Sequence, residues 1–107
     1  MANVLGEKFM KIIALEKERR SASADEYTPY LKAEARKVWE LQQAGIIREI
    51  YFRQDRSSAV LIMECGDSKA AQAILNVLPL VQAGLIEFEL IPLVPYPGYA
   101  RLFAAKP

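Results

Sequence analysis

Apolar and polar positions change their spacing several times along the chain, and each change predicts a new secondary-structure element. The run KFMKIIAL at 8–15 is apolar apart from two lysines, which predicts a strand. The segment at 16–27 is polar and predicts a loop. Beyond it, apolar residues recur at helical spacing, which predicts an amphipathic helix. The face at this spacing carries Leu31, Ala35, Val38 and Trp39 and ends with the polar Gln42.

Local signals define both ends of this first helix. Thr28 is suited to the N-cap, and Pro29 to the first helical position, where its missing N–H costs no hydrogen bond. Gly45 stands where a left-handed residue commonly ends a helix. We therefore expect the helix to run between Thr28 and Gly45.

The next two apolar segments predict a hairpin. IIREIYFR at 46–53 and SAVLIMEC at 58–65 are rich in β-branched and aromatic residues. The polar residues 54–57 between them predict a short turn. Two antiparallel strands are the expected result.

A second helix and a last strand complete the pattern. Asp67 is suited to cap a helix at about 68–78, which Pro79 is expected to stop. Gly84 lies in the spacer that follows, and alternating apolar and acidic residues at 85–91 predict a strand. The residues from 96 to 107 are interpreted as a tail that either packs on a partner subunit or frays.

The predicted order is β-α-β-β-α-β over a single domain, residues 1–107. This order favours the α+β class and the ferredoxin-like fold, a four-stranded antiparallel sheet with both helices on one face. Period-two spacing divides the strand residues between two faces. One face takes Leu61, Met63, Ile86, Phe88 and Leu90, and the other mixes aliphatic residues with charges: Glu49, Tyr51, Arg53, Val60, Ile62, Glu64, Glu87, Glu89 and Ile91. A second copy of the chain is the simplest cover for this mixed face.

Composition narrows the possible chemistry. The net charge is +1, from 14 basic and 13 acidic residues, so no electrostatic footprint favours nucleic acid or an anionic membrane. No apolar run reaches the length of a membrane span. Cys65 is the only cysteine, so an internal disulfide is impossible, and a reducing, cytoplasmic location is expected. The chain has no histidine, which excludes Ser-His-Asp catalysis and most zinc sites. We expect no metal and no cofactor.

Two segments resemble a known family. LKAEARKVWELQQAGIIREIYFR at 31–53 resembles the first helix and second strand of muconolactone isomerases, and LPLVQAGLIEFELIPL at 78–93 resembles their last helix end and strand. The order of elements agrees over about 8–95. The resemblance implies the dimeric α/β-barrel superfamily, which includes YCII-like proteins and antibiotic-biosynthesis monooxygenases and pairs two ferredoxin-like sheets. It implies a homodimer or a larger assembly of dimers. The muconolactone isomerases carry histidines near strand 2 and after the last strand, where this chain has none.

The resemblance also implies a small-molecule enzyme that shifts a proton on a small organic acid or lactone. Such a reaction needs a base, an acid and a group that holds a carboxylate. Without histidine, the candidate base is Glu64 near the end of an apolar strand, with Tyr51 as a second proton carrier. A turn centred on 55–58 places Glu49 opposite Glu64, where the two carboxylates repel. A different register places Arg53 near Glu64 and gives an ion pair. Both registers remain open.

Several further residues are candidates for binding an acidic ligand. Arg53 and Tyr51 share one strand face, and Lys32 and Arg36 lie one helical turn apart. Trp39 is a candidate for stacking on a ligand, although a place in the core is favoured. The alternative function is a non-catalytic module that binds a small molecule or assembles with itself. Cys65 is interpreted as a small buried hydrophobe.

Overall fold

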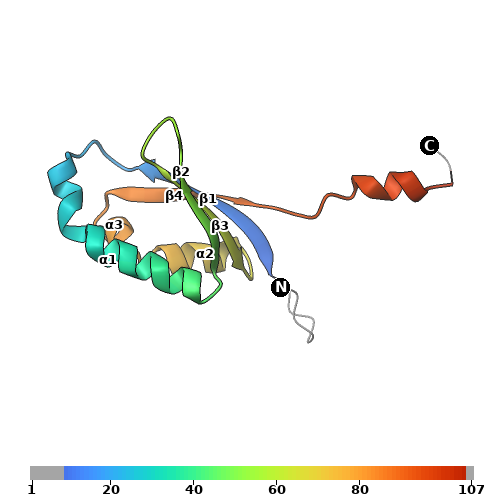
Figure 1. Cartoon of the computed structure of the whole chain (residues 1–107), viewed down its shortest axis with the longest axis horizontal. Helices are drawn as coiled ribbons and strands as arrows, with labels where there is room; N and C mark the ends of the chain where they lie inside the picture. Colours follow the sequence, from blue (N-terminus) through green and yellow to red (C-terminus); the bar gives the residue numbers. More distant parts are fainter. Residues whose placement is uncertain (1–8, 106–107) are drawn as a thin grey trace.

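The computed structural model describes residues 9–105, in which helices cover one side of a β-sheet (Figure 1). The first and last strands frame two hairpin strands and three helices, and a short 3₁₀ helix follows the sheet. The elements are β1 (Met10–Glu18), α1 (Ala24–Gln43), β2 (Ile47–Phe52), β3 (Ala59–Cys65), α2 (Ser68–Leu75), α3 (Pro79–Gln82), β4 (Ile86–Pro92) and η1 (Gly98–Phe103).

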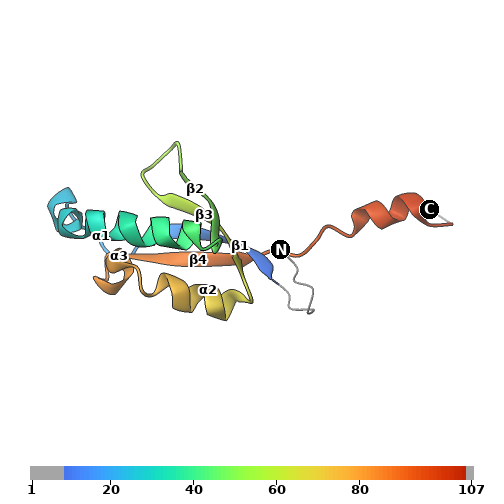
Figure 2. The same cartoon turned by 60° about the horizontal axis from the view of Figure 1, so that its bottom comes forward.

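The strand order across the sheet is β2-β3-β1-β4, and every neighbouring pair is antiparallel. The first strand therefore lies in the middle, with β3 on one side and β4 on the other. All three helices lie on the same side of the sheet (Figures 1 and 2). This arrangement confirms the predicted ferredoxin-like α+β fold.

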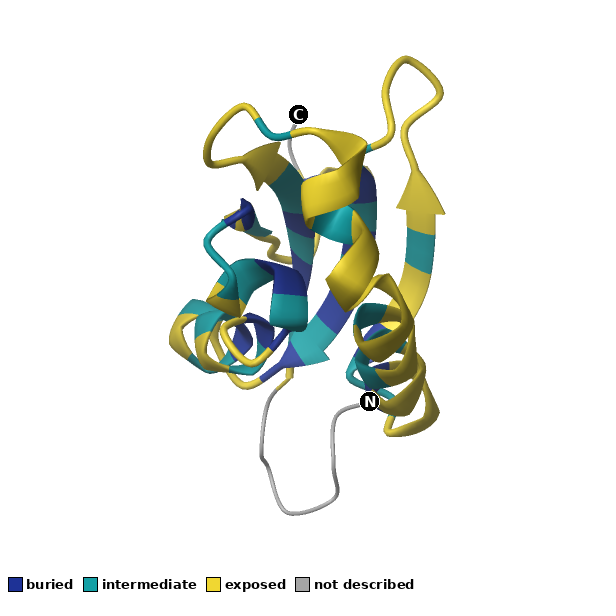
Figure 3. Ribbon diagram, turned by 90° about the vertical axis from the view of Figure 1, so that its left-hand side faces the viewer, coloured by how far each residue is buried: buried dark blue, intermediate teal, exposed yellow. Residues whose placement is uncertain are grey.

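Period-two alternation places the core on the helix side of the sheet, as predicted. Figure 3 shows buried positions alternating with less buried ones along the strands. The core residues of the strands are Ile12, Ala14, Ile47, Ala59, Leu61, Met63, Cys65, Ile86 and Phe88. Cys65 is among them, which confirms its interpretation as a small buried hydrophobe. Burial also raises the pKa of its thiol, to which the nearby charge of Asp67 adds.

The opposite face of the sheet is only partly covered within one chain. We call this the open face. Its centre is a stripe of half-buried aliphatic residues: Ile13, Leu15, Val60, Ile62 and Ile91. Charged residues surround this stripe, and several are paired, as in the Lys17–Glu89 ion pair at 3.2 Å.

The start of α1 differs from the prediction. The helix begins at Ala24 with Ser23 as N-cap, not at Thr28, and Pro29 lies inside it. Ser23 donates its N–H to the Glu26 carboxylate at 3.0 Å, which is half of a capping box. The helix therefore begins five residues earlier than a start at Pro29 would place it. Thr28 instead donates its hydroxyl to the Ala24 carbonyl at 3.0 Å.

Other boundaries also shift. The first strand runs to Glu18 and not to 15, so the predicted loop at 16–27 is shorter, and Lys8 lies outside the described residues. The second helix ends at Leu75, and Pro79 starts α3 instead of only stopping α2, because proline fits the first helical position. Gly45 has a φ of +79°, which confirms its predicted left-handed role.

A bulge in β2 settles the hairpin register. Ile47 pairs with Met63 and Glu49 with Ile62, so Arg48 is the extra residue. Neither expected register holds, because Glu49 faces Ile62 and not Glu64. The bulge turns Ile47 towards the core and leaves Glu49 on the open face.

No helix of the described residues is both long and apolar enough to cross a lipid bilayer.

Replacing Gly45 with alanine should lower the free energy of unfolding by about 1–2 kcal/mol, because an L side chain is strained at positive φ. Denaturant unfolding measures the change. Gly66→Ala is the matched control, because a Cβ there meets nothing within 4 Å and its φ lies outside the left-handed region. Equal losses in the two variants would contradict the assignment of strain to Gly45.

Candidate functional site

A cavity of about 780 Å³ lies between α1 and the helix side of the sheet. Its volume is within the range of small-molecule sites, roughly 300–1,000 Å³. The helix packs against α3 and β2, but of its residues only Leu41, near its C-terminal end, is buried. The rest of the helix leaves space above the sheet, and this space is the cavity.

The lining explains why the space stays open. Four of the lining residues are alanines, at 22, 24, 35 and 59, whose short side chains leave the volume unfilled. The apolar stripe predicted on α1 faces this space, since Leu31, Ala35, Val38, Trp39 and Gln42 all line it. At the mouth, Trp39 is 61% and Phe52 is 72% exposed. The site is therefore an apolar hollow with an aromatic rim.

Glu16 brings the first carboxylate into this hollow. It follows Ile12 and Ala14 on the core face of β1, where period-two alternation directs its side chain towards the helices. Its Oε1 accepts the N–H of Ala59 at 2.9 Å. Burial raises the pKa of Glu16, an effect that the Ala59 hydrogen bond opposes and the charge of Glu18 reinforces.

Glu34 brings the second carboxylate from the opposite wall. It lies on α1 and accepts the N–H of Leu80 at 3.0 Å. Leu80 is in the first turn of α3, whose N-cap Leu78 offers no side-chain cap, so Glu34 caps this helix from a distance. Burial raises the pKa of Glu34, which the Leu80 hydrogen bond opposes and the charge of Glu16 raises further.

The two carboxylates keep one oxygen each for other contacts. Only Oε1 of Glu16 and of Glu34 forms a hydrogen bond among residues 9–105. No fully buried side-chain polar atom in that range lacks a partner, so each Oε2 is accessible. Tyr27 lines the same cavity, and burial raises its pKa, with the charges of Glu18 and Glu16 adding to the effect. The cavity thus gathers acids that bind protons more readily than usual.

The predicted base, Glu64, lies elsewhere. It is on the open face of β3, half-buried, with the Arg48 guanidinium 3.9 Å from its carboxylate. The Arg48 contact takes the place of the Arg53 contact that one register predicted. Glu64 does not line the cavity.

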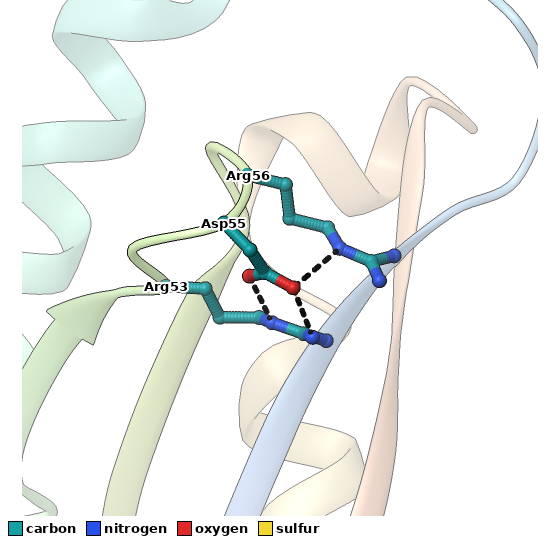
Figure 4. A network of polar contacts seen from close by, with 3 residues as sticks. All are labelled: Arg53, Asp55 and Arg56. Atoms are coloured by element: carbon teal, nitrogen blue, oxygen red, sulfur yellow. Dashed lines mark hydrogen bonds and ion pairs between the residues drawn. The ribbon is translucent and has the colours of Figure 1, made fainter.

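The predicted partners of Glu64 lie along β2 and the turn after it. Tyr51 donates its hydroxyl to Glu49 at 2.7 Å, and this bond to an anion raises the pKa of Tyr51. Arg53 forms a two-point contact with Asp55, at 2.9 and 2.7 Å, and Arg56 approaches the same carboxylate (Figure 4). The Arg53 hydrogen bond lowers the pKa of Asp55. Arg53 is therefore engaged within its own turn.

The predicted helix residues divide between two places. Lys32 and Arg36 line a separate shallow hollow beside Val77 and Pro79, so they do not reach the carboxylates. Trp39 lines the cavity mouth and is mostly exposed, so the favoured place in the core is wrong. Of the seven predicted site residues, Trp39 alone belongs to the cavity.

The sequence contains a signal for each of the two cavity carboxylates, Glu16 and Glu34, although neither was predicted as a site residue. Glu34 lies three residues after Leu31 and four before Val38, on the apolar side of α1, where an ionisable residue is unusual. Glu16 continues the period-two series of Ile12 and Ala14. The polar loop predicted at 16–27 concealed this continuation. Among the described residues, no group of three or more potential ligand side chains could hold a metal ion.

The family model described as muconolactone delta-isomerase matches residues 10–98. The chain belongs to the muconolactone delta-isomerase family. The match covers every strand and helix from β1 to β4, and with them the whole cavity lining. It confirms the resemblance found in the sequence. No protein with a curated description matches the chain.

The free energy of unfolding should depend on whether Glu34 is protonated. Its raised pKa means that the folded chain binds this proton more readily than the unfolded chain, whose ordinary value is 4.5. The stabilisation from this carboxyl is therefore present below pH 4.5 and is lost as the pH rises through the folded value. The free energy of unfolding of the unmodified chain, relative to Glu34→Gln, should fall across that interval and then level off.

Denaturant unfolding at a series of pH values measures this difference. Glu40→Gln, on the same helix, is the control and should not reproduce the pH-dependent change. Glu34→Ala should be less stable than Glu34→Gln by about 1–3 kcal/mol, because alanine leaves the Leu80 N–H without an acceptor. A pH-independent difference between the unmodified chain and Glu34→Gln would contradict the raised pKa.

Proposed function

We propose that the chain is an isomerase that moves a proton on a small unsaturated lactone or organic acid within the cavity between α1 and the sheet. The observation that carries the proposal is the pair of half-buried carboxylates, Glu16 and Glu34, on opposite walls of one apolar hollow. Membership of the muconolactone delta-isomerase family supports the reaction class.

The two carboxylates suit the two halves of a proton shift. A base must remove a proton from one carbon of the substrate, and an acid must return one to another carbon. Burial raises the pKa of both groups, and the charge of Glu16 raises that of Glu34 further, so we assign the acid role to Glu34 and the base role to Glu16. In this scheme Glu16 accepts the proton from carbon and Glu34 delivers its own. Each uses the accessible Oε2.

The chain has no histidine to act as a base near neutral pH, and in this proposal burial makes a carboxylate basic enough to do so. An ordinary carboxylate is a weak base near neutral pH, and desolvation strengthens it by disfavouring the charged form. The backbone N–H groups of Ala59 and Leu80 hold each carboxylate by one oxygen. Both side chains are therefore positioned before a substrate arrives, which lowers the cost of ordering them.

Replacing Glu16 or Glu34 with glutamine should reduce kcat on muconolactone by at least about a hundredfold, the scale of a lost general acid or base. Proton NMR in deuterated water follows both isomerisation and deuterium uptake at carbon. Glutamine keeps the acceptor oxygen for the backbone N–H, so a large loss of fold is not expected, and circular dichroism checks this.

Glu64→Gln is the comparison that separates the two candidate sites. Glu64 and Tyr51, with Arg53 and Glu49, remain an alternative site on the open face, which a paired sheet would enclose. If Glu64→Gln abolishes turnover while the two cavity variants remain active, the open face is the active site. If the folded chain converts no lactone, the non-catalytic module is favoured.

We also propose that two chains pair through their open faces. The aliphatic stripe of Ile13, Ile62 and Ile91 runs across three neighbouring strands, and a single chain leaves it only half-buried. Exposed apolar surface of this kind commonly marks an interface. Pairing of the sheets agrees with the dimeric barrel implied by the sequence resemblance.

Replacing Ile62 with lysine should raise the dimer dissociation constant at least tenfold, because an ammonium group in the middle of the interface loses its hydration without a partner. Light scattering at micromolar concentration measures the molar mass. Gln43→Lys adds the same charge at the exposed end of α1 and should leave the mass unchanged. A monomeric unmodified chain would exclude the pairing.

A further inference from the structure

The residues after β4 form an arm that leaves the body of the molecule. We use "the arm" for residues 93–105, which include η1 (Figures 1 and 2). The molecule measures 62 Å along its longest axis, and its radius of gyration is 17.0 Å. A compact chain of this length has a radius of about 13 Å. The arm therefore has little contact with the body of its own chain.

The arm is internally ordered although it is exposed. The rings of Tyr96 and Tyr99 meet edge to face with centroids 5.0 Å apart. Gly98 is buried against Tyr96, and a Cβ at this position would collide with the ring. Beyond this contact, Leu102 is 75% and Phe103 is 87% exposed. A preformed segment with such apolar side chains is suited to docking on another surface.

Charge indicates which surface the arm fits. Arg101 is the only charged residue of the arm, and no salt bridge engages it within residues 9–105. The cavity contains three carboxylates, Glu16, Glu18 and Glu34, and its lining includes no lysine or arginine. In contrast, acidic residues of the open face already form ion pairs with basic residues of the same chain. Glu89 pairs with Lys17, Glu87 with Arg19 and Glu64 with Arg48. The cavity is therefore the better complement for Arg101.

The topology separates each arm from its own cavity. The arm begins after Pro92, which pairs with Ile12, whereas the cavity lies towards the end of the sheet where Ile86 pairs with Glu18. The six residue steps from Ile12 to Glu18 span about 20 Å. A two-fold axis that reverses the strand direction between two copies brings the arm of one copy to the cavity end of the other. With residues 94–97 extended and the six residues of η1 rising about 2 Å each, the arm reaches about 25 Å, which exceeds the spacing of about 10 Å between two stacked sheets.

We propose that the arm of a second copy closes the mouth of the cavity and places Arg101 beside its carboxylates. Leu102 and Phe103 of that copy then cover the apolar rim formed by Leu31, Trp39 and Phe52. The complete site consists of acids from one chain and a cation from the other. For the substrate this inference rests on the proposed function: Arg101 binds the carboxylate of the lactone acid, for which the cavity itself offers no cation.

Disulfide trapping tests the docking without reference to activity. One chain carries Phe103→Cys and a size tag, and a second chain carries Phe52→Cys at the cavity mouth. The matched control is Tyr51→Cys, because residues 51 and 52 are neighbours on β2, both exposed, and point to opposite sheet faces. Cys65 is buried in every chain and does not compete.

We expect the mixed disulfide with Phe52→Cys to form at least ten times faster than the one with Tyr51→Cys. A faster reaction at residue 51 would place the arm on the open face and overturn the proposal. Absence of both cross-links would overturn it as well.

A second measurement tests the position of Arg101. Arg101→Ala should raise the pKa of Glu34, because a nearby cation favours the charged form, and carbon-13 NMR of the carboxyl groups follows this titration. Arg101→Lys should restore part of the difference. An unchanged titration in Arg101→Ala would overturn the placement of Arg101 even if the cross-link forms.

Kinetics then separate this inference from the proposed function. Arg101→Ala should raise KM for muconolactone at least tenfold and change kcat less. Mixed oligomers of Arg101→Ala and Glu34→Gln should regain activity that neither variant has alone at low substrate, because some sites then combine an intact cavity with an intact arm. If the unmodified chain has no turnover but trapping and titration succeed, the arm proposal stands and the isomerase proposal fails. If the unmodified chain isomerises muconolactone but the disulfide trapping fails, the isomerase proposal stands and the arm proposal fails.

Discussion

The hydrogen bond from the Leu80 N–H to Glu34 connects α1 to the rest of the helical layer. Apart from this bond, the helix is anchored mainly at its C-terminal end, where Leu41 is buried and Gly45 turns the chain into β2. Glu34 accepts this bond with Oε1, and the bond also caps the first turn of α3. The contact therefore fixes α1 relative to α3, and the cavity lies between this helix and the sheet.

The same bond links stability to the candidate chemistry. Glu34 must be near the backbone of α3 to fix the helix, and this position is partly buried, so its pKa is raised. Glu16 repeats the arrangement on the sheet, where its carboxylate accepts the N–H of Ala59 at the start of β3. In both cases one oxygen supports the fold and the other is accessible from the cavity. A structural role and a proposed chemical role are therefore combined in each of these side chains.

Local patterns in the sequence predicted the fold well because the fold depends on them. Period-two alternation in β3 and β4 and the glycine at 45 correctly indicated the sheet faces and the end of α1. The capping box at Ser23 and Glu26 was equally local, but the proline at 29 offered a competing start. The bulge at Arg48 was harder to predict, because it adds one residue to a strand whose composition does not change.

The site was less predictable because it depends on distances between segments remote in sequence. Glu34 and Leu80 are 46 residues apart, and Glu16 and Ala59 are 43 apart, so no local pattern pairs them. A search for a base at the end of an apolar strand favoured Glu64, which the bulge leaves beside Arg48 on the open face. The useful signal was an acidic residue on a face that is otherwise apolar. An acid in such a position either has a partner across the core or titrates unusually, and Glu34 does both.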